Sequence, residues 1–425
     1  MKAEESLRRS SLWMIGGQFT AMAAQGLYFI LIGRALGSRE YGAFVGVAAL
    51  TGALSQVSSL GMEMILVRNI SRDQASFART WGQGLALSMG GFLALLAAAM
   101  IFAHFALRPE LRALVPWIAL ADGLFGKFIQ LAGRAFQGAG RLASTAGLTA
   151  LASITRALTA GIVWLYARAH ALQPTALLWA RFYWVATLAI ALVALVLVTV
   201  RLGWPRFTPI GRADLSQGLS FSLSSSSISI YNDIDKTFLV SLGQSCAAGI
   251  YSAAYRVVDA LSAPILAIHA AAAPRFFREG MRGAESARAF SHAMLRRTLG
   301  YSLAAAGLLA VSAPLVPMLF GPSFEGSITV LRWLCMLPVL RALHYAWGSA
   351  ITASASQWNR TATQFAAAAL NLCLDWLLIP RWSWRGAAVA SLLTDAALAL
   401  VSWLVLARLI RREREARAAI SLTVS

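Results

Sequence analysis

Long apolar runs separated by short polar segments recur along the whole chain of 425 residues. A helix needs about 20 mainly apolar residues to cross a hydrocarbon core roughly 30 Å thick. Because backbone polar groups in lipid must be satisfied within the span itself, we expect each run to be a helix. About twelve spans of this length are predicted, at approximately 11–33, 43–66, 81–105, 113–133, 142–167, 176–200, 217–241, 248–273, 298–319, 327–352, 361–380 and 386–409.

Charged residues are scarce, which supports a membrane protein over a soluble one. They make up 13% of the chain, and the mean hydropathy is +0.64. Soluble globular chains carry about 25% charged residues. The longest polar segments between spans, 201–216 and 274–297, are too short for a soluble domain. The predicted fold class is therefore an all-α polytopic membrane protein.

The formal net charge is +19, and the positions of the Lys and Arg residues explain it. If the amino terminus is cytoplasmic, 23 of the 37 lie in cytoplasmic segments and 7 in outer loops. The remaining 7 lie in or beside spans. This asymmetry follows the positive-inside rule and places both termini in the cytoplasm. The basic clusters are then topology signals and contacts for anionic membrane lipids, and no nucleic-acid partner is expected.

Two stretches half a chain apart are similar. "LIGRALGSREYGAFVGVAAL" begins at residue 31 and "FLVSLGQSCAAGIYSAAYRVV" at residue 238, so that Gly37 matches Gly243 and Gly42 matches Gly249. Six spans lie on each side, which predicts two parallel six-helix bundles, 1–205 and 206–425. The alternative is that two outer turns acquired Gly independently for steric reasons.

Fourteen ionisable residues lie in or near the predicted spans. Each costs at least ~2.5–3.5 kcal/mol in hydrocarbon, so it should face a partner, a bundle interior or water. The seven bases are Lys127, Arg156, Arg181, Lys236, Arg256, Arg332 and Arg341, and the seven acids are Glu63, Asp122, Asp233, Asp235, Asp259, Asp375 and Asp395.

Arg156 is the most constrained of these charges, because it lies mid-span and its helix contains no acid. Small residues surround it, which suits a closely packed helix. One interpretation is an anion site facing a central cavity, since a guanidinium binds phosphate oxygens in a fork and stays charged. The other is an interhelical salt bridge, for example to Asp122.

The seventh span carries an unusual polar run, "SSSSISIYNDIDKTFLVSLG". Asp233 and Lys236 are three residues apart and can neutralise each other on one helix face, and Arg256 and Asp259 repeat this spacing. Asp235 points elsewhere, and we expect it to lack a partner on its own helix.

Because this span opens the second half, its polar face should line a substrate cavity between the halves. The predicted substrate-binding residues are Arg156, Asp233, Asp235, Lys236, Arg256, Asp122 and Asn232.

Three stretches resemble one protein family in the expected order. "RALGSREYGAFVGVAAL" resembles its opening, "IYNDIDKTFLVSLGQSCAAGIYSAAYRVVD" its seventh and eighth helices, and "LNLCLDWLLIPRWSWRGAAVASLLTD" its eleventh and twelfth. The family is the polysaccharide-biosynthesis, or oligosaccharide flippase, proteins of the multidrug/oligosaccharidyl-lipid/polysaccharide exporter superfamily, which implies a MATE-like fold.

The resemblance implies transfer of an undecaprenyl-diphosphate-linked oligosaccharide to the outer face of the bacterial inner membrane, for O-antigen or exopolysaccharide synthesis. It also implies a polysaccharide polymerase and a chain-length regulator as partners. A lipid II flippase and a cation-coupled multidrug exporter of the same superfamily are the alternatives. Such exporters resemble antiporters with an essential acid in the first helix, and residues 11–33 contain no Asp or Glu.

No other chemistry has a comparable signal. "DID" matches the metal-binding Asp-x-Asp of many glycosyltransferases, but those sites lie in a soluble fold. Zinc, P-loop and nucleophile-elbow motifs do not occur in the sequence. We therefore expect a transporter rather than an enzyme, with no cofactor or metal. Its driving force would be an ion gradient, the membrane potential or consumption of the product. A non-transporting scaffold, the third class, would lack a water-filled cavity.

The charge asymmetry gives a direct topology test. Cys246 lies in a predicted outer loop, whereas Cys335 and Cys373 lie within spans. A membrane-impermeant maleimide applied to intact cells with a permeabilised outer envelope should label Cys246 alone. Labelling of Cys246 only after lysis would reverse the predicted orientation.

Overall fold

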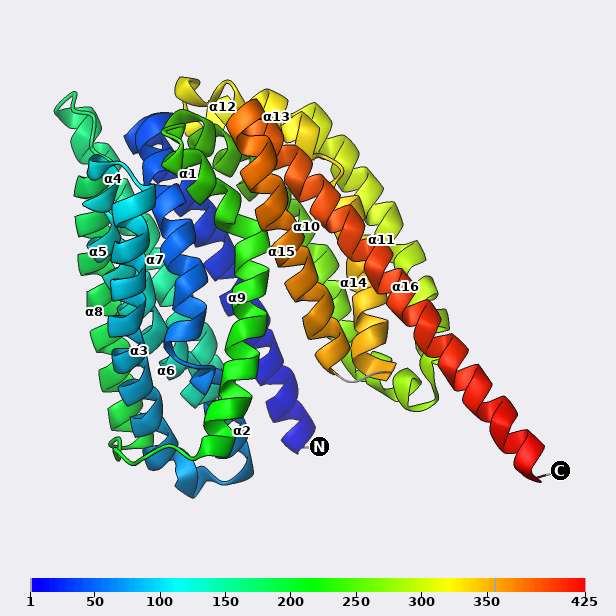
Figure 1. The fold of residues 1–425 in the computed structure, drawn as a ribbon. Coiled ribbons are helices and arrows are strands. Elements are labelled where there is room, and N and C mark those ends of the chain that lie inside the picture. Colours follow the sequence, from blue (N-terminus) through cyan, green and yellow to red (C-terminus); the bar gives the residue numbers. More distant parts are fainter. Residues whose placement is uncertain (1, 355–356, 425) are drawn as a thin grey trace. The chain divides into compact units, whose positions relative to one another are not determined.

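The computed structural model describes the backbone of residues 2–354 and 357–424. Side chains are described over the same ranges except at 2–15, 213, 220, 357–358 and 416–424. Within these limits the chain is helical almost throughout and contains no strand (Figure 1), which confirms the predicted all-α class.

The helices form two compact units. Unit 1 comprises Met1–Gly249 and Leu319–Ser323, and unit 2 comprises Ile250–Met318 and Phe324–Ser425. Elements α1 to α9 belong to unit 1: α1 (Lys2–Ser58), α2 (Met62–Arg72), η1 (Gln74–Ser76), α3 (Phe77–Ala106), α4 (Pro109–Arg112), α5 (Val115–Ile118), η2 (Ala119–Phe125), α6 (Gly126–Gly138), α7 (Leu142–Ala169), α8 (Ala176–Leu202) and α9 (Arg212–Ser241).

The later elements lie mainly in unit 2. They are α10 (Ser245–Met281), α11 (Ala284–Ser312), α12 (Leu315–Phe320), η3 (Pro322–Phe324), α13 (Ser327–Leu334), α14 (Leu337–Ser354), α15 (Gln357–Trp382) and α16 (Trp384–Val424). The first residues of α10 and the segment Leu319–Ser323 belong to unit 1 instead.

Each of the twelve predicted spans overlaps a helix, or two or more consecutive short helices, of the described chain. Nine of the described helices are long and apolar enough to cross a membrane. The first of these is broken at Gly37, whose φ of 70° interrupts α1, and it therefore supplies two spans. The remaining two, α9 and α11, have 30 and 29 residues but a more polar composition.

The predicted end of the second span is wrong. The sequence predicts a second span at 43–66, but the helix ends at Ser58 and a separate helix, α2, begins at Met62. Gly61 adopts φ 70° at this break, and a Cβ atom there would lie 2.2 Å from the carbonyl oxygen of Gly218 in α9. The break thus combines a left-handed turn with a close approach between chain segments.

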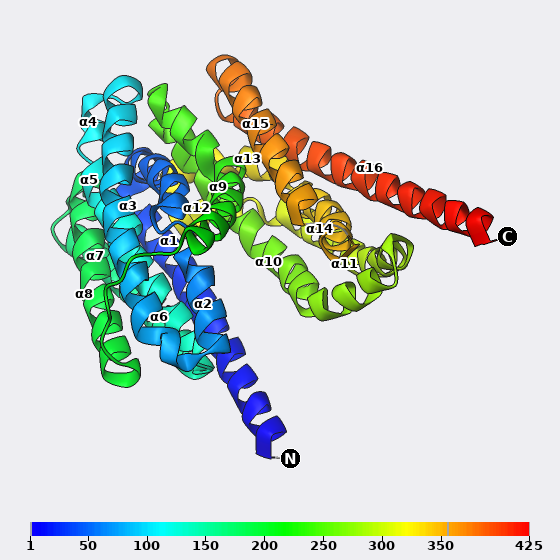
Figure 2. The same cartoon turned by 60° about the horizontal axis from the view of Figure 1, so that its bottom comes forward.

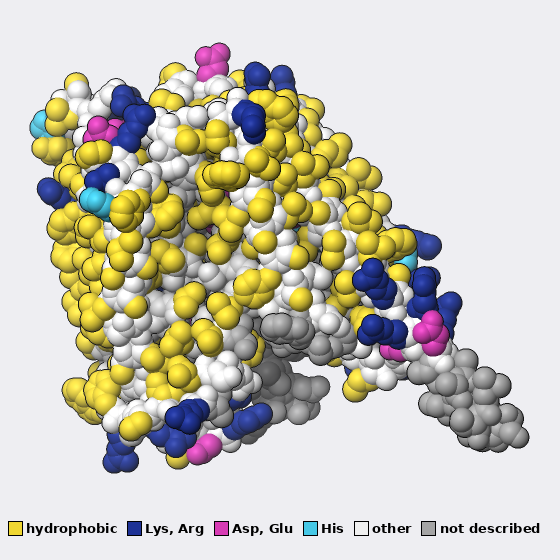
Figure 3. Space-filling model, in the orientation of Figure 1, with side chains coloured by type: hydrophobic (Ala, Val, Ile, Leu, Met, Phe, Trp, Pro, Cys, Tyr) yellow, Lys and Arg dark blue, Asp and Glu magenta, His cyan; other side chains and the backbone are white. Residues whose placement is uncertain are grey.

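The surface of unit 1 fits a lipid environment. Leu93 and Ile101 on α3, and Leu192 and Val196 on α8, are 54–61% exposed. On the face shown in Figure 3, hydrophobic side chains cover the middle of this unit and basic side chains gather toward its ends. An apolar belt between charged ends is what a bilayer requires.

Each unit has a core of its own. Trp81, Leu131 and Phe136 anchor the core of unit 1, and Phe276 and Trp347 anchor that of unit 2. In both orientations of the ribbon, α1 runs beside α7 (Figures 1 and 2), against which it packs along its length.

The repeat-matched glycines form a reciprocal contact within unit 1. A Cβ atom at Gly42 would lie 1.8 Å from the carbonyl oxygen of Ser245, and one at Gly249 would lie 1.9 Å from that of Ser38. The two contacts are related by one shift of 207 residues, from 42 to 249 and from 38 to 245. Gly37 and Gly243 both have positive φ, 70° and 76°. Such exchange is how two copies of one motif meet about a two-fold axis.

The predicted division at 205/206 follows the repeat, whereas the compact units divide at 249/250. The two divisions differ in where they place α9, which belongs to unit 1 because it packs on α1. Thr237 Oγ1 in α9 donates a hydrogen bond to the Gly46 carbonyl oxygen in α1 at 2.8 Å. Gly46 permits this approach, since a Cβ atom there would lie 2.4 Å from Val240. The six-helix division of the sequence stays a prediction.

The glycine contact predicts a specific sensitivity. Gly42→Ala and Gly249→Ala should each destabilise the protein by about 1–3 kcal/mol or more, because a methyl group would meet backbone on the partner segment. Gly26→Ala, on the same helix α1 but with nothing within 4 Å, is the matched control. It should be neutral or stabilising by up to about 1 kcal/mol. Equal melting temperatures for all three variants would contradict the contact.

Candidate functional site

Unit 1 contains a cavity of about 660 Å³. Its walls come from α1, α2, η2, α6, α7 and α9. Helix α7 contributes one periodic face, Thr145, Leu148, Thr149, Ala152, Ser153 and Arg156. This three-and-four spacing is that of residues on one side of a helix, so a single stripe of α7 forms a wall. We call this space the inner cavity.

Arg156 lies in the wall of the inner cavity. Its guanidinium carbon is 5.4 Å from the centroid of the Tyr183 ring, a cation–π geometry. Among the described residues it forms no ion pair within 4.0 Å. The predicted salt bridge to Asp122 is therefore not made directly, although both side chains line the same cavity.

Asp122 is placed by an irregular stretch of backbone. It lies in η2, a π-helix spanning Ala119–Phe125, where each turn holds more residues than in an α-helix. Its Oδ1 atom accepts a hydrogen bond from the Tyr183 hydroxyl at 2.5 Å. Tyr183 thus contacts Arg156 with its ring and Asp122 with its hydroxyl.

A second acid in the cavity wall is neutralised. Glu63 Oε1 lies 2.9 Å from Lys127 Nζ and accepts a hydrogen bond from the Ser59 hydroxyl at 2.7 Å. The Lys127 side chain is 2% exposed, so this pair replaces solvent for a buried ammonium group. The remaining lining charges are Arg134 and Arg156 against Asp122, a net single positive charge.

Uncharged hydrogen-bonding groups supply most of the other polar lining. They are amides and hydroxyls on four helices, α1, α6, α7 and α9: Gln18, Ser55, Gln56, Gln130, Gln137, Thr145, Thr149, Ser153, Ser222 and Ser225. Ser222 and Ser225 come from the serine-rich part of α9. Such groups both donate and accept hydrogen bonds, as recognition of hydroxyl-rich ligands requires.

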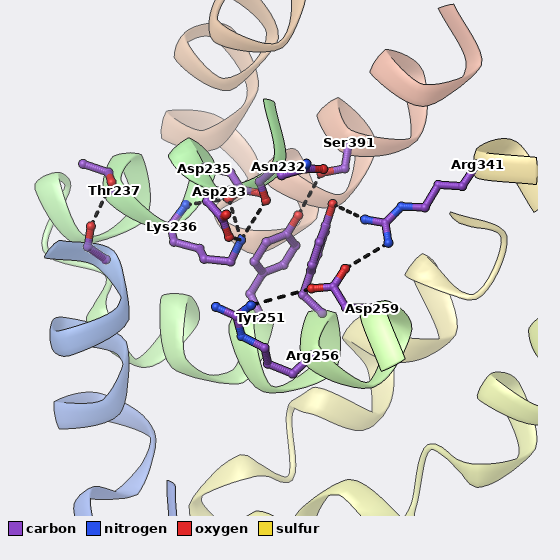
Figure 4. Close-up of polar contacts among 12 residues, drawn as sticks. Asn232, Asp233, Asp235, Lys236, Thr237, Tyr251, Arg256, Asp259, Arg341 and Ser391 are labelled. Carbon is purple, nitrogen blue, oxygen red and sulfur yellow. Dashed lines mark hydrogen bonds and ion pairs between the residues drawn. The ribbon is translucent and has the colours of Figure 1, made fainter. Parts of the chain in front are cut away.

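The charges further along α9 form a cluster of their own (Figure 4). Lys236 Nζ lies 2.9 Å from Asp233 Oδ1 and donates at 2.9 Å to the carbonyl oxygen of Asn232. Asp235 Oδ1 lies 3.4 Å from the same Nζ atom and accepts from the Lys236 backbone N–H at 2.7 Å.

This geometry overturns one expectation. Asp235 does have a partner on its own helix, because the long Lys236 side chain folds back over the preceding residue. Lys236 and Asp235 are each 1% exposed, whereas the Asp233 side chain is 36% exposed. None of these residues, nor Asn232, belongs to the lining of the inner cavity. Their contact with substrate stays a prediction.

Arg256 lies in unit 2 on α10. Its Nη1 atom is 3.7 Å from Asp259, which also pairs with Arg341 at 2.9 Å (Figure 4). Arg341 donates a further hydrogen bond to the Tyr255 hydroxyl at 3.0 Å. Arg256 therefore belongs to a charge network within unit 2, and the inner cavity contains only Arg156 and Asp122 of the seven predicted residues.

Comparison with known proteins supplies the family. The model of the polysaccharide biosynthesis protein family matches residues 7–279. The chain belongs to this family. No curated protein sequence is significantly similar to it.

Solved structures show the fold of this polysaccharide biosynthesis protein. An inward-facing multidrug resistance MATE family transporter of the MOP superfamily has a TM-score of 0.74 and 17% identity, covering 92% of this chain and 96% of that one. An outward-facing transporter of the same description has a TM-score of 0.63 and 17% identity, covering 94% of this chain and 96% of that one. A MOP superfamily transporter from Pyrococcus furiosus Vc1 has a TM-score of 0.65 and 16% identity, covering 95% of each chain. The predicted MATE-like fold is confirmed.

Sequence reasoning did not find three parts of this family member's site. Tyr183 is uncharged and its local sequence does not mark it as a site residue, and the π-helical geometry of η2 has no sequence signature here. Glu63 and Lys127 were both noted but not joined, because they are 64 residues apart. The three-and-four spacing of small and polar residues on α7 could have predicted that one face of this helix lines a cavity. Among the described residues no group of three or more His, Cys, Asp or Glu could hold a metal ion.

Proposed function

We propose that this protein translocates an undecaprenyl-diphosphate-linked oligosaccharide from the cytoplasmic to the outer face of the bacterial plasma membrane. The observation that carries the proposal is Arg156, an arginine in mid-span that faces a polar cavity and has no ion pair among the described residues. A charge kept in a span at such cost is a functional-site candidate.

The chemistry of the inner cavity suits a diphosphate joined to sugar. Arg156 can bind phosphate oxygens through two parallel N–H groups, and the Tyr183 ring beneath it restricts its orientation. Lys127 neutralises the charge of Glu63, so the remaining charged side chains of the lining give the cavity a net positive charge. The surrounding amides and hydroxyls match sugar hydroxyl groups.

The fold class and the charge asymmetry support a proposed mode of transport. Two bundles that expose a site alternately to each side would carry the polar head while the polyprenyl chain stays in lipid. In the orientation that the charge asymmetry predicts, the Arg134 and Gln137 end of the inner cavity would face the cytoplasm. A polymerase and a chain-length regulator would act on the product outside.

Cation-coupled drug export is the second candidate, because Asp122 is a carboxylate in the cavity wall and the solved relatives include multidrug transporters. Against it, Asp122 is already hydrogen-bonded to Tyr183, and the first span contains no acid.

Deletion of the gene separates these functions. We expect undecaprenyl-linked repeat units to accumulate on the cytoplasmic face and surface polysaccharide to disappear, as measured by analysis of extracted lipid-linked sugars. Unchanged glycan together with new sensitivity to cationic dyes would favour drug export and contradict the proposal.

Substitution at Arg156 tests the site itself. Arg156→Gln should abolish transport at normal protein level, and Arg156→Lys should retain part of it, at roughly a tenfold loss, because an ammonium attracts phosphate without the bidentate fork. Arg181→Gln is the matched control. Arg181 also stacks on an aromatic ring, Trp117 at 5.5 Å, but does not line the cavity.

The salt-bridge interpretation makes the opposite forecast. If Arg156 serves only to neutralise Asp122, Arg156→Ala should lower the protein level, since breaking a buried pair costs about 3–5 kcal/mol. The double change Arg156→Ala with Asp122→Ala should then restore both protein level and transport. Such a rescue would rule out the substrate-site role.

A further inference from the structure

Unit 1 contains a second cavity, of about 720 Å³, which we call the outer pocket. It is formed by three segments: the α1 turn at 34–40, the last part of α7, and the segment 320–323. Three arginines line it, Arg34, Arg39 and Arg168, together with one acid, Glu40. The inner cavity shares none of these residues.

The two cavities lie toward opposite ends of α7. Arg156 and Arg168 are twelve residues apart on this helix, a separation of about 18 Å along its axis. The charge asymmetry that places the termini in the cytoplasm places the outer pocket at the extracytoplasmic end.

The arginines of the outer pocket are unusual for their position. Only 7 of the 37 basic residues fall in predicted outer loops, and three of those seven line this one pocket. Basic residues there oppose the topology signal that the rest of the chain obeys. Their concentration around one cavity calls for a ligand or a local partner.

The other four outer arginines have local roles. Arg112 donates to the Leu107 carbonyl oxygen at 2.8 Å, and Arg381 donates to that of Leu377 at 2.8 Å. Arg108 packs against the turn glycine Gly243, and Arg385 stacks on Trp384 at 5.5 Å.

Two arginines of the outer pocket, Arg39 and Arg168, have no acidic partner among the described residues. Arg39 makes no hydrogen bond or ion pair with any described residue, and Arg168 stacks on Trp164 at 5.6 Å with no acid within ion-pair distance. Glu40, the only acid in the lining, accepts a hydrogen bond from the Ala176 backbone N–H at 2.7 Å. The pocket is therefore net positive.

The pocket walls are fixed in place. The Ser38 backbone N–H donates to Ser323 Oγ at 3.1 Å, and Arg34 Nε donates to the Leu319 carbonyl oxygen at 2.5 Å. Phe320 packs on Gly33, where a Cβ atom would lie 2.6 Å from its ring. A pre-organised wall lowers the ordering cost of binding a ligand.

We propose that the outer pocket is a second anion site, which binds a lipid-borne phosphate group at the outer membrane surface. The chemistry suits either the diphosphate of the arriving substrate or the headgroup of an outer-leaflet phospholipid. The first source rests on the proposed function, whereas the second does not. Arg39 and Arg168 supply the phosphate contacts, and Trp164, on which Arg168 stacks, is of a residue type enriched where spans meet lipid headgroups.

The test measures binding without transport. Inorganic pyrophosphate is titrated calorimetrically into the full-length protein in maltoside micelles at low ionic strength, where screening is weak. In the Arg156→Gln background, which lacks the proposed inner site, the double variant Arg39→Gln, Arg168→Gln should bind at least roughly tenfold more weakly than Arg156→Gln alone. Arg385→Gln is the matched control, an outer arginine that also stacks on tryptophan but lies outside the pocket, and it should bind as the parent does.

A second arm identifies the source of the phosphate. Native mass spectrometry counts phosphatidylglycerol molecules retained by each protein after exchange from nanodiscs. Loss of pyrophosphate affinity in the double variant supports a site for substrate diphosphate. Unaltered pyrophosphate titrations with loss of one retained lipid support a headgroup site. If the double variant matches the parent in both arms, the proposal is overturned.

Two further variants keep the outcomes separate. Arg156→Gln, which removes the proposed inner site, should keep the outer pocket's binding. If Arg156→Gln instead removes all pyrophosphate binding and lipid retention is unchanged in the double variant, the outer pocket is refuted while the transport proposal stands. Should the double variant unfold, Arg39→Gln alone replaces it, since Arg39 makes no hydrogen bond or ion pair with a described residue.

Discussion

An ionised side chain in hydrocarbon must find a counter-charge or water, and this requirement organises the interior of both units. Where a partner is within reach the charges pair: Lys127 with Glu63, Lys236 with Asp233 and Asp235, Arg341 with Asp259. Arg156 takes the other solution, because it borders a cavity and rests on an aromatic ring. Ion pairing and placement beside a cavity both stabilise a buried charge. Only placement beside a cavity leaves the charge available to a ligand.

Local features of the structure were predictable from the sequence, because helical geometry converts spacing into contact. The spans followed from apolar run length, and the i,i+3 pairs Asp233–Lys236 and Arg256–Asp259 followed from three-residue spacing. The glycines of the repeat marked two left-handed turns, at Gly37 and Gly243. Their reciprocal contact also involves Ser38 and Ser245, whose backbone carbonyls carry no sequence signature.

Long-range features were not predictable, because they depend on how helices meet. Tyr183 and Asp122 are 61 residues apart, and nothing in either local sequence indicates their hydrogen bond. The prediction that Asp235 lacks a partner on its own helix was wrong for a different reason. Adjacent helical residues point in different directions, so a rule based on spacing excludes them, yet a lysine stem of four carbons can fold back. The extent of unit 1 also escaped prediction, since a sequence repeat does not state which helices pack most closely.

The π-helical turn at Ala119–Phe125 gives the inner cavity a dependence on backbone register. A change of one residue in the number held by this stretch would rotate everything after it by about 100° relative to what precedes it. Asp122 would then turn away from Tyr183, and Lys127, on the following helix, would turn away from Glu63. The floor of the cavity is therefore specified by how many residues lie between Pro109 and Gly126 as much as by which residues they are. Relatives that differ there by a single insertion or deletion would have a different cavity even if every polar side chain were kept.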